Sequence, residues 1–140
     1  EVITSMAVKD DLMAGESYFI REIRYLKRIL DSLNEEQMIL CSIDEILRGT
    51  NTGERIRASR AILDYLADKN CIALVATHEK ELTELLSGTY VNYHFSEEIG
   101  ENDIHFSYEL IEGPATSQNA VKLLEFAGFP EEIIAESQKI

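Results

Sequence analysis

The chain has 140 residues, and hydrophobic types make up 45% of them, which is enough for one globular domain with its own core. Its 26 acidic and 13 basic residues give a formal net charge of −13. This charge argues against direct binding to nucleic acid or to an anionic membrane, because clustered Lys and Arg bind phosphates. No apolar run approaches the length of a transmembrane helix. A start at Glu1, next to a strand-like segment, predicts a piece of a longer protein.

The two cysteines indicate the compartment. Cys41 and Cys71 both lie within apolar runs, and no other Cys or His stands at the spacing of a metal site. We therefore interpret them as small core residues of a protein in the reducing environment of the cytoplasm.

The first part of the chain predicts a strand and then an amphipathic helix. Residues 2–8 are mostly apolar and predict a short strand, after which Gly15 lies in a loop. Ser17 then precedes apolar residues spaced by three and four, and it is placed to cap the helix that they define. The expected inward residues are Phe19, Ile23, Leu26, Leu30 and Leu33. Another face carries Arg21, Arg24 and Arg28, either as a solvated face or as a contact for an acidic partner.

Two apolar runs predict neighbouring strands of a parallel sheet. Residues 38–43 form one run, which ends in the adjacent carboxylates of Asp44 and Glu45. Residues 71–76 form the other run, and His78 follows it after one threonine. Neither run alternates between apolar and polar residues, as is typical of a sheet that is covered on both faces.

A helix is expected between these strands and a shorter one after them. The first covers about residues 54–69, and Leu82, Leu85 and Leu86 indicate the second. The expected inward residues of the first are Ile56, Ser59, Leu63 and Leu66. This alternation of strands and helices indicates βαβ units and an α/β fold class.

The last part of the chain predicts a hairpin and two helices. Residues 89–95 and 104–110 alternate with period two around an acidic turn over residues 96–103, which indicates an antiparallel hairpin. Ser117 opens a helix that Gly128 ends, and Pro130 suits the first turn of a last helix. The expected inward residues are Ala120, Val121, Leu124, Ala127, Ile133 and Ile134.

The ends of the two parallel strands bring Asp44, Glu45 and His78 to one edge of the predicted sheet. Open α/β sheets bind ligands at that edge. Adjacent acids there either face water, as strand ends often do, or hold a cation such as Mg²⁺. Asp44 suits the cation, Glu45 suits proton transfer from an attacking water, and His78 suits a departing phosphate or the water itself. His78 alone would be interpreted as a helix-start histidine, whereas the three together favour the functional interpretation.

Three further polar residues are weaker candidates. Ser17 at a helix start offers a hydroxyl and free backbone amides to a phosphate, although serine caps helices generally. His94 and His105 fall within the alternating hairpin, and we interpret both as structural.

Four motifs resemble those of the MutS-type ATPases, in the order of that family. Residues 38–45 are similar to its Walker B strand, and residues 44–52 extend the likeness into the D-loop. Residues 75–82 resemble its histidine switch, and residues 4–22 its signature segment. Residues 117–130 resemble its closing helices, so that the likeness spans nearly the whole chain.

Three departures from the family's usual pattern indicate a divergent branch. The signature usually has Thr where Tyr18 stands, and the D-loop usually has Gly where Leu47 stands. The closing helix usually begins Ser-Tyr-Gly, whereas Gln118 and Asn119 follow the serine here. These changes argue against mismatch recognition more than they argue against ATP hydrolysis.

The resemblance implies a P-loop NTPase-like fold of the ABC type, with a three-layer sheet and flanking helices. Residues 1–112 would form the sheet with its motifs, and residues 113–140 the closing helices. The Walker A pattern G-x-x-x-x-G-K-[ST] does not occur in the chain, and in the family this loop lies upstream. We therefore expect the chain to be the C-terminal half of an ATPase domain. Alone, it should be inactive and should not bind ATP tightly.

In the complete parent protein, the resemblance implies ATP and Mg²⁺ as ligands, a homodimer formed through the ATPase domains, and DNA contacts through other domains. Asp44 would position Mg²⁺ through water, and Glu45 would activate the attacking water. His78 would sense the γ-phosphate. Ser17 would reach the γ-phosphate that the opposite subunit binds.

The sequence also bears on three other functions. A dimerisation and regulatory module that no longer hydrolyses ATP is compatible with the altered signature and D-loop. A phosphoacceptor domain would need a lysine after a later strand, where this chain has Thr77 and His78. A transporter-type ATPase would need a Leu-Ser-Gly-Gly-Gln signature, which is absent from the sequence.

Overall fold

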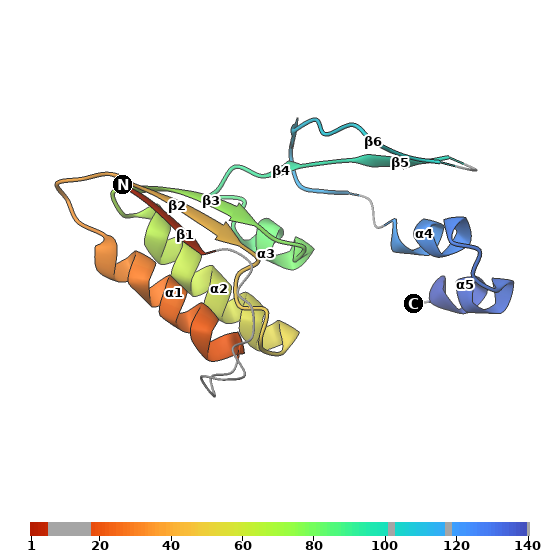
Figure 1. Cartoon of the computed structure of the whole chain (residues 1–140), viewed down its shortest axis with the longest axis horizontal. Helices are drawn as coiled ribbons and strands as arrows, with labels where there is room; N and C mark the ends of the chain where they lie inside the picture. The colour runs from red at the N-terminus through yellow and green to blue at the C-terminus, as the bar shows by residue number, and fades with distance from the viewer. Residues whose placement is uncertain (6–17, 101–102, 117–118, 140) are drawn as a thin grey trace. The chain divides into compact units, whose positions relative to one another are not determined.

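Three parallel strands form the sheet of the first half of the chain, in the order β1-β2-β3 (Figure 1). They are β1 (Val2–Ser5), β2 (Ile39–Asp44) and β3 (Cys71–Ala76). The computed structural model describes residues 1–5, 18–100, 103–116 and 119–139. Ile3 pairs with Cys41, and Asp44 pairs with Ala76, so the carboxyl ends of β2 and β3 lie at the same edge of the sheet.

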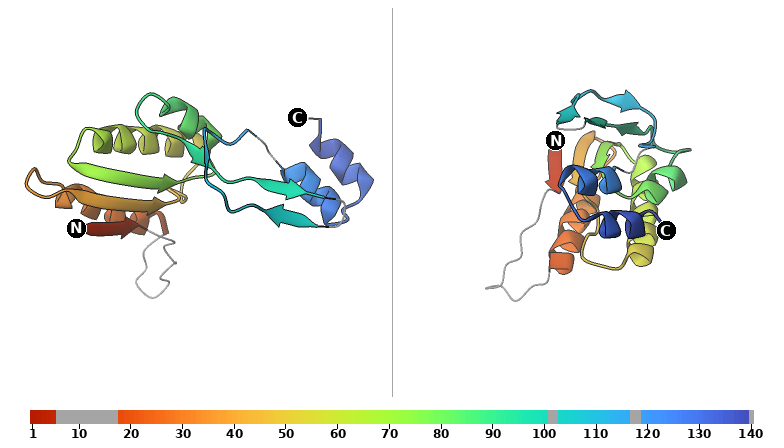
Figure 2. Two further views of the ribbon diagram at one scale, coloured as in Figure 1. Left: turned by 90° about the horizontal axis from the view of Figure 1, so that it is seen from above. Right: turned by 90° about the vertical axis from the view of Figure 1, so that its right-hand side faces the viewer.

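Helices α1 (Tyr18–Ser32) and α2 (Thr52–Ala67) lie side by side on one face of this sheet (Figures 1 and 2). The shorter helix α3 (Lys80–Leu85) follows β3 and contributes Leu82 to the same core. The fully buried side chains include Ile29, Ile39, Cys41, Ile43, Leu63, Leu66 and Leu82. Within the described part of the chain, no helix is long and apolar enough to cross a membrane.

The expected inward residues hold for α2, and they hold for α1 except at Ile23. Ile56, Ser59, Leu63 and Leu66 are all buried, as predicted. In α1, Ile23 is 42% exposed, while Ile29 is 1% exposed and lies in the core. The buried stripe of α1 consists of Glu22, Leu26 and Ile29. Of the predicted inward residues, Leu26 is buried, and Phe19, Leu30 and Leu33 are half-buried against the core, so the prediction fails only at Ile23.

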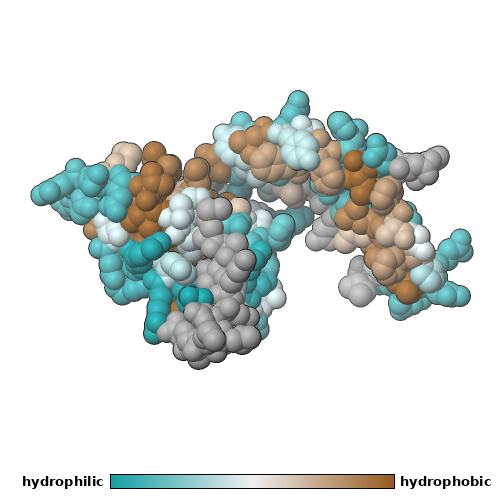
Figure 3. All heavy atoms as spheres, viewed as in Figure 1, coloured by the Kyte–Doolittle hydropathy of each residue, from teal (hydrophilic) through white to brown (hydrophobic). Residues whose placement is uncertain are grey.

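The opposite face of the sheet carries exposed apolar side chains. Val2, Ile72 and Leu74 share that face by register, and all three are exposed. Figure 3 shows hydrophobic side chains at the surface over these strands. The sequence predicts two covered faces, whereas helices of the first unit cover one. Apolar residues on both faces explain why the strands do not alternate in sequence.

Residues Val91–Ile140 form a second compact unit, and Glu1–Tyr90 form the first. In the second unit β4 (Tyr93–His94) pairs with β7 (Ile111–Glu112), and β5 (Glu97–Ile99) pairs with β6 (Ile104–Phe106), both antiparallel. Two helices follow, α4 (Ala120–Phe126) and α5 (Glu131–Ser137). No described side chain of this unit is fully buried. The unit therefore contains both the hairpin and the two closing helices.

The antiparallel hairpin is confirmed, but its turn is shorter than expected. Strand β5 occupies part of the predicted turn, and the backbone N–H of Gly100 donates to the carbonyl of Asp103 at 2.8 Å. Acidic residues fit in β5 because the strand has an exposed side. Gly128, with a φ of 73°, follows the end of α4 as predicted. Ile133, Ala120 and Ala127 are exposed rather than inward. Val121, Leu124 and Ile134 are half-buried.

Candidate functional site

The segment after β2 turns sharply and begins with a predicted site residue. Glu45 has a φ of 59° and Leu47 a φ of 56°, both in the left-handed region that L residues rarely adopt. The backbone N–H of Glu45 donates to the carbonyl of Ala76 at 3.0 Å. The side chains of Ile46 and Leu47 are buried in the core. Their burial offsets a backbone strain of about 1–3 kcal/mol for each left-handed residue.

Glu45 and His78 meet at the carboxyl edge of the sheet. Glu45 Oε1 lies 3.2 Å from His78 Nε2, and Glu45 Oε2 lies 4.0 Å from Arg48 Nε. The side chain of Glu45 is 14% exposed, whereas that of His78 is 91% exposed. A largely enclosed carboxylate therefore lies beside a histidine that reaches solvent, a geometry suited to proton transfer. The prediction that the two strand ends bring these residues together is confirmed, and their catalytic roles stay predictions.

Arg48 links this loop to the start of α1. A hydrogen bond with Tyr18 raises the pKa of the Arg48 guanidinium, and the charges of Glu45 and Asp44 act in the same direction. An arginine guanidinium is charged in proteins, so Arg48 counters part of the negative charge of the two acids. The sequence pattern predicts no role for Arg48.

A buried carboxylate from α1 binds the far end of the same loop. Glu22 is 4% exposed, and its two oxygens accept hydrogen bonds from the backbone N–H groups of Arg48 at 3.0 Å and Gly49 at 3.1 Å. Gly49 lies directly against Phe19, where a Cβ would come within 2.6 Å of the Phe19 Cβ. No role was predicted for Glu22. A carboxylate placed three residues after Phe19 and four before Leu26, on an apolar stripe, is the signal that marks it.

An ion pair holds the segment that follows His78. Arg55 of α2 pairs with Glu79, and the backbone N–H of Glu79 donates to Thr77 Oγ1 at 3.0 Å. These contacts tie the end of β3 to α2, because Arg55 and Glu79 come from the two elements. They fix the backbone on both sides of His78 and leave its ring in solvent.

Asp44 is the last residue of β2 and is half-buried. Among the residues that the structure describes, no three His, Cys, Asp or Glu side chains are grouped to hold a metal ion. Mg²⁺ is commonly bound by one or two carboxylates together with water and substrate phosphates. A carboxylate at a strand end is compatible with that mode.

The remaining predicted residues lie away from this edge or outside the description. Ser17 is among the residues that the structure does not describe. His94 Nδ1 lies 2.9 Å from the carbonyl oxygen of Gly113, which agrees with a structural role. Cys41 and Cys71 are free thiols, and burial raises the pKa of Cys41 to about 11. The interpretation of Cys41 as a core residue is confirmed.

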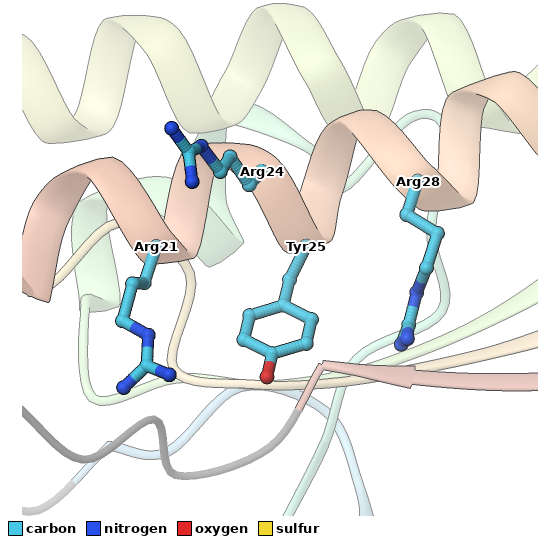
Figure 4. Close-up of a pocket in the computed structure, with 4 residues that line it drawn as sticks. All are labelled: Arg21, Arg24, Tyr25 and Arg28. Carbon is cyan, nitrogen blue, oxygen red and sulfur yellow. The ribbon is translucent and has the colours of Figure 1, made fainter. Parts of the chain in front are cut away.

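The arginine face of α1 is a second candidate surface. Arg21, Arg24, Tyr25 and Arg28 line a shallow pocket of about 290 Å³ (Figure 4). Arg28 donates to the backbone carbonyl of Thr4 at 3.0 Å, and its guanidinium lies 5.1 Å from the centre of the Tyr25 ring. Arg28 therefore fastens α1 to β1, so that at least part of this basic face serves the fold.

A parallel sheet with helices on one face defines an α/β domain, and its carboxyl edge, where the adjacent acids lie, is the edge at which open α/β sheets bind ligands. The model of the family described as MutS domain V matches residues 1–140. The chain belongs to this family.

Full-length relatives of known name agree with the match. The chain is 36% identical to the DNA mismatch repair protein MutS of Aquifex pyrophilus, and 34% identical to DNA mismatch repair protein MutS 2 of Haloarcula marismortui. It is 29% identical to MutS of Thermus thermophilus. Each comparison covers 99% of the chain but only 15% to 17% of the relative.

Proposed function

We propose that the chain is the C-terminal part of the ATPase domain of a divergent MutS-like DNA repair protein, and that the complete protein hydrolyses ATP. The observation that carries this proposal is the contact between Glu45 and His78 at the carboxyl edge of the sheet, directly after Asp44. Family membership supports it over the full chain.

In this proposal the enclosed carboxylate of Glu45 is the general base. It takes a proton from the attacking water while the water oxygen bonds to the γ-phosphorus and the bond to the β,γ-bridging oxygen breaks. His78 contacts the γ-phosphate from the solvent side. Asp44 would hold Mg²⁺ through water, and the ion would supply positive charge that favours phosphoryl transfer. Ser17 reaches the γ-phosphate bound by the opposite subunit of a homodimer.

The phosphate cradle and its lysine come from another part of the parent protein, because no Walker A pattern occurs in the chain. The apolar face of the sheet that the helices of the first unit leave open supports this view, since Ile72 and Leu74 need a partner layer to leave water. With that layer the domain is the three-layer P-loop NTPase-like fold. DNA is bound by other domains, in keeping with the net charge of −13 here.

The alternative is a dimerisation module that does not hydrolyse ATP. The residue at position 47 of the D-loop helps to decide between the two functions. The family usually has Gly where Leu47 stands, and Leu47 keeps the left-handed backbone that Gly would favour. Its buried side chain anchors that conformation. The substitution therefore leaves the loop that carries Glu45 in place, which favours hydrolysis.

The substitution Glu45→Gln in the complete protein tests the proposal. Gln keeps the size of the side chain but cannot accept the proton, so turnover of ATP should fall about 10²–10⁴-fold while ATP binding persists. Glu84→Gln, on the exposed side of α3, is the matched control and should leave turnover unchanged. Undiminished hydrolysis by Glu45→Gln would remove Glu45 from the role of base. Absence of turnover in the unsubstituted protein would favour the non-hydrolysing alternative.

A further inference from the structure

Glu22 is a buried carboxylate that is bound only by backbone amides in the contacts described. Its oxygens accept from the N–H groups of Arg48 and Gly49, at 3.0 and 3.1 Å, and its side chain is 4% exposed. Burial of a carboxylate is costly unless hydrogen bonds compensate it. Here two consecutive backbone N–H groups point to one carboxylate, and a turn of this kind binds anions. The contact joins α1 to a loop that lies 26 residues further along the chain.

The loop that Glu22 binds has a conformation that needs support. It contains the left-handed residues Glu45 and Leu47, which persist only where their surroundings fix them. One end is fixed by the hydrogen bond from the N–H of Glu45 to Ala76. The middle is fixed by the buried side chain of Leu47. Glu22 fixes the other end, so that the loop is held on both sides of the turn.

We propose that Glu22 is a positioning residue for Glu45, which it keeps beside His78 by holding the amides of Arg48 and Gly49. That Glu22 holds the loop follows from these contacts alone. Its consequence for catalysis rests on the proposed function, in which Glu45 is the base. A shift of about 1 Å in a catalytic group can reduce turnover about 100-fold.

Glu22→Gln separates this role from a general effect on folding. Gln has nearly the shape of Glu, but its NH₂ group cannot accept from the second amide, so one of the two hydrogen bonds is lost. Asp31→Asn is the matched control, because it removes a carboxylate from an exposed position of the same helix. Both variants are made in the complete protein.

Hydrogen exchange with mass spectrometry gives a readout that needs no ATPase activity. In Glu22→Gln the peptide covering residues 45–50 should exchange at least about tenfold faster, while the peptide covering β2 should not change. Steady-state kinetics should show a fall in kcat of about 10–100-fold with KM within about twofold. Asp31→Asn should change neither quantity.

Each outcome decides the inference. Unchanged exchange in residues 45–50 would overturn the contact, and faster exchange with unchanged kcat in an active protein would overturn the positioning role. If Glu22→Gln does not fold, Gly49→Ala displaces the same loop without a change of charge and should show the same two effects. If the unsubstituted protein has no turnover, the proposed function fails, and the exchange result alone decides whether Glu22 holds the loop.

Discussion

Gly49 is the position where one added methyl group should test the packing of α1 on the loop after β2. A Cβ at this position would lie 2.6 Å from the Cβ and 2.8 Å from the Cα of Phe19. Ordinary contacts begin at 3.4 Å, so the loop and the helix would have to separate by nearly 1 Å. The obstacle includes the backbone of α1, and a change of side-chain rotamer cannot relieve it. The backbone angles of Gly49 are open to alanine, so the cost is steric.

The magnitude follows from three contributions. Forced overpacking costs about 1–3 kcal/mol. The same separation stretches the two hydrogen bonds to Glu22, and charge-assisted bonds of this kind are worth about 1.5–3 kcal/mol each when fully lost. Replacement of Gly by Ala restricts the unfolded chain and returns about 0.4–1 kcal/mol. We expect Gly49→Ala to lower the free energy of unfolding by about 2–4 kcal/mol.

Urea unfolding of the 140-residue chain, followed by circular dichroism, measures this change. Gly53→Ala is the matched control, because a Cβ there meets only Arg57 Nη1 at 3.7 Å and Asn51 Oδ1 at 3.8 Å. Gly53 lies in the first turn of α2, where alanine should stabilise the helix by about 0.5–1 kcal/mol. The two variants should therefore shift the midpoint in opposite directions. A midpoint for Gly49→Ala equal to or above the unsubstituted value would refute the close packing of α1 on the loop.

Two further predictions concern stability. Burial raises the pKa of Cys41 to about 11 and that of Tyr90 to about 12. The stability that the two protonated groups contribute to the folded state is therefore complete below pH about 9, and it is lost as the pH rises through these values. Unfolding free energies measured between pH 9 and about 11 should fall with pH, and they should fall less steeply in Cys41→Ala. Equal slopes would contradict the burial of the thiol. Asn51 caps α2 by accepting from the N–H of Glu54 at 3.0 Å, so Asn51→Ala should cost about 1 kcal/mol. A midpoint unchanged by Asn51→Ala would show that this cap adds nothing.

The edge that carries the candidate site could be predicted because its residues follow strand ends. Apolar runs before Asp44 and His78 predict strands, and parallel pairing brings their carboxyl ends together. This pairing places Glu45 and His78 at the same edge, and the conformation of the loop after β2 then sets their 3.2 Å contact. By contrast, the inward stripe of α1 was only partly predicted, since apolar residues such as Ile23 flank the true stripe.

The sequence predicts the helices and strands of the first unit, the parallel pairing of β2 and β3, and the acidic edge that they share. Each of these follows from local spacing and from the rule that strands and helices alternate in βαβ units. The tertiary structure alone decided that Glu22 binds the amides of Arg48 and Gly49, and that Glu45 and Leu47 adopt left-handed angles. Hydrogen bonds between residues 26 positions apart, and backbone angles that packing imposes on a non-glycine loop, leave no periodic pattern in the sequence.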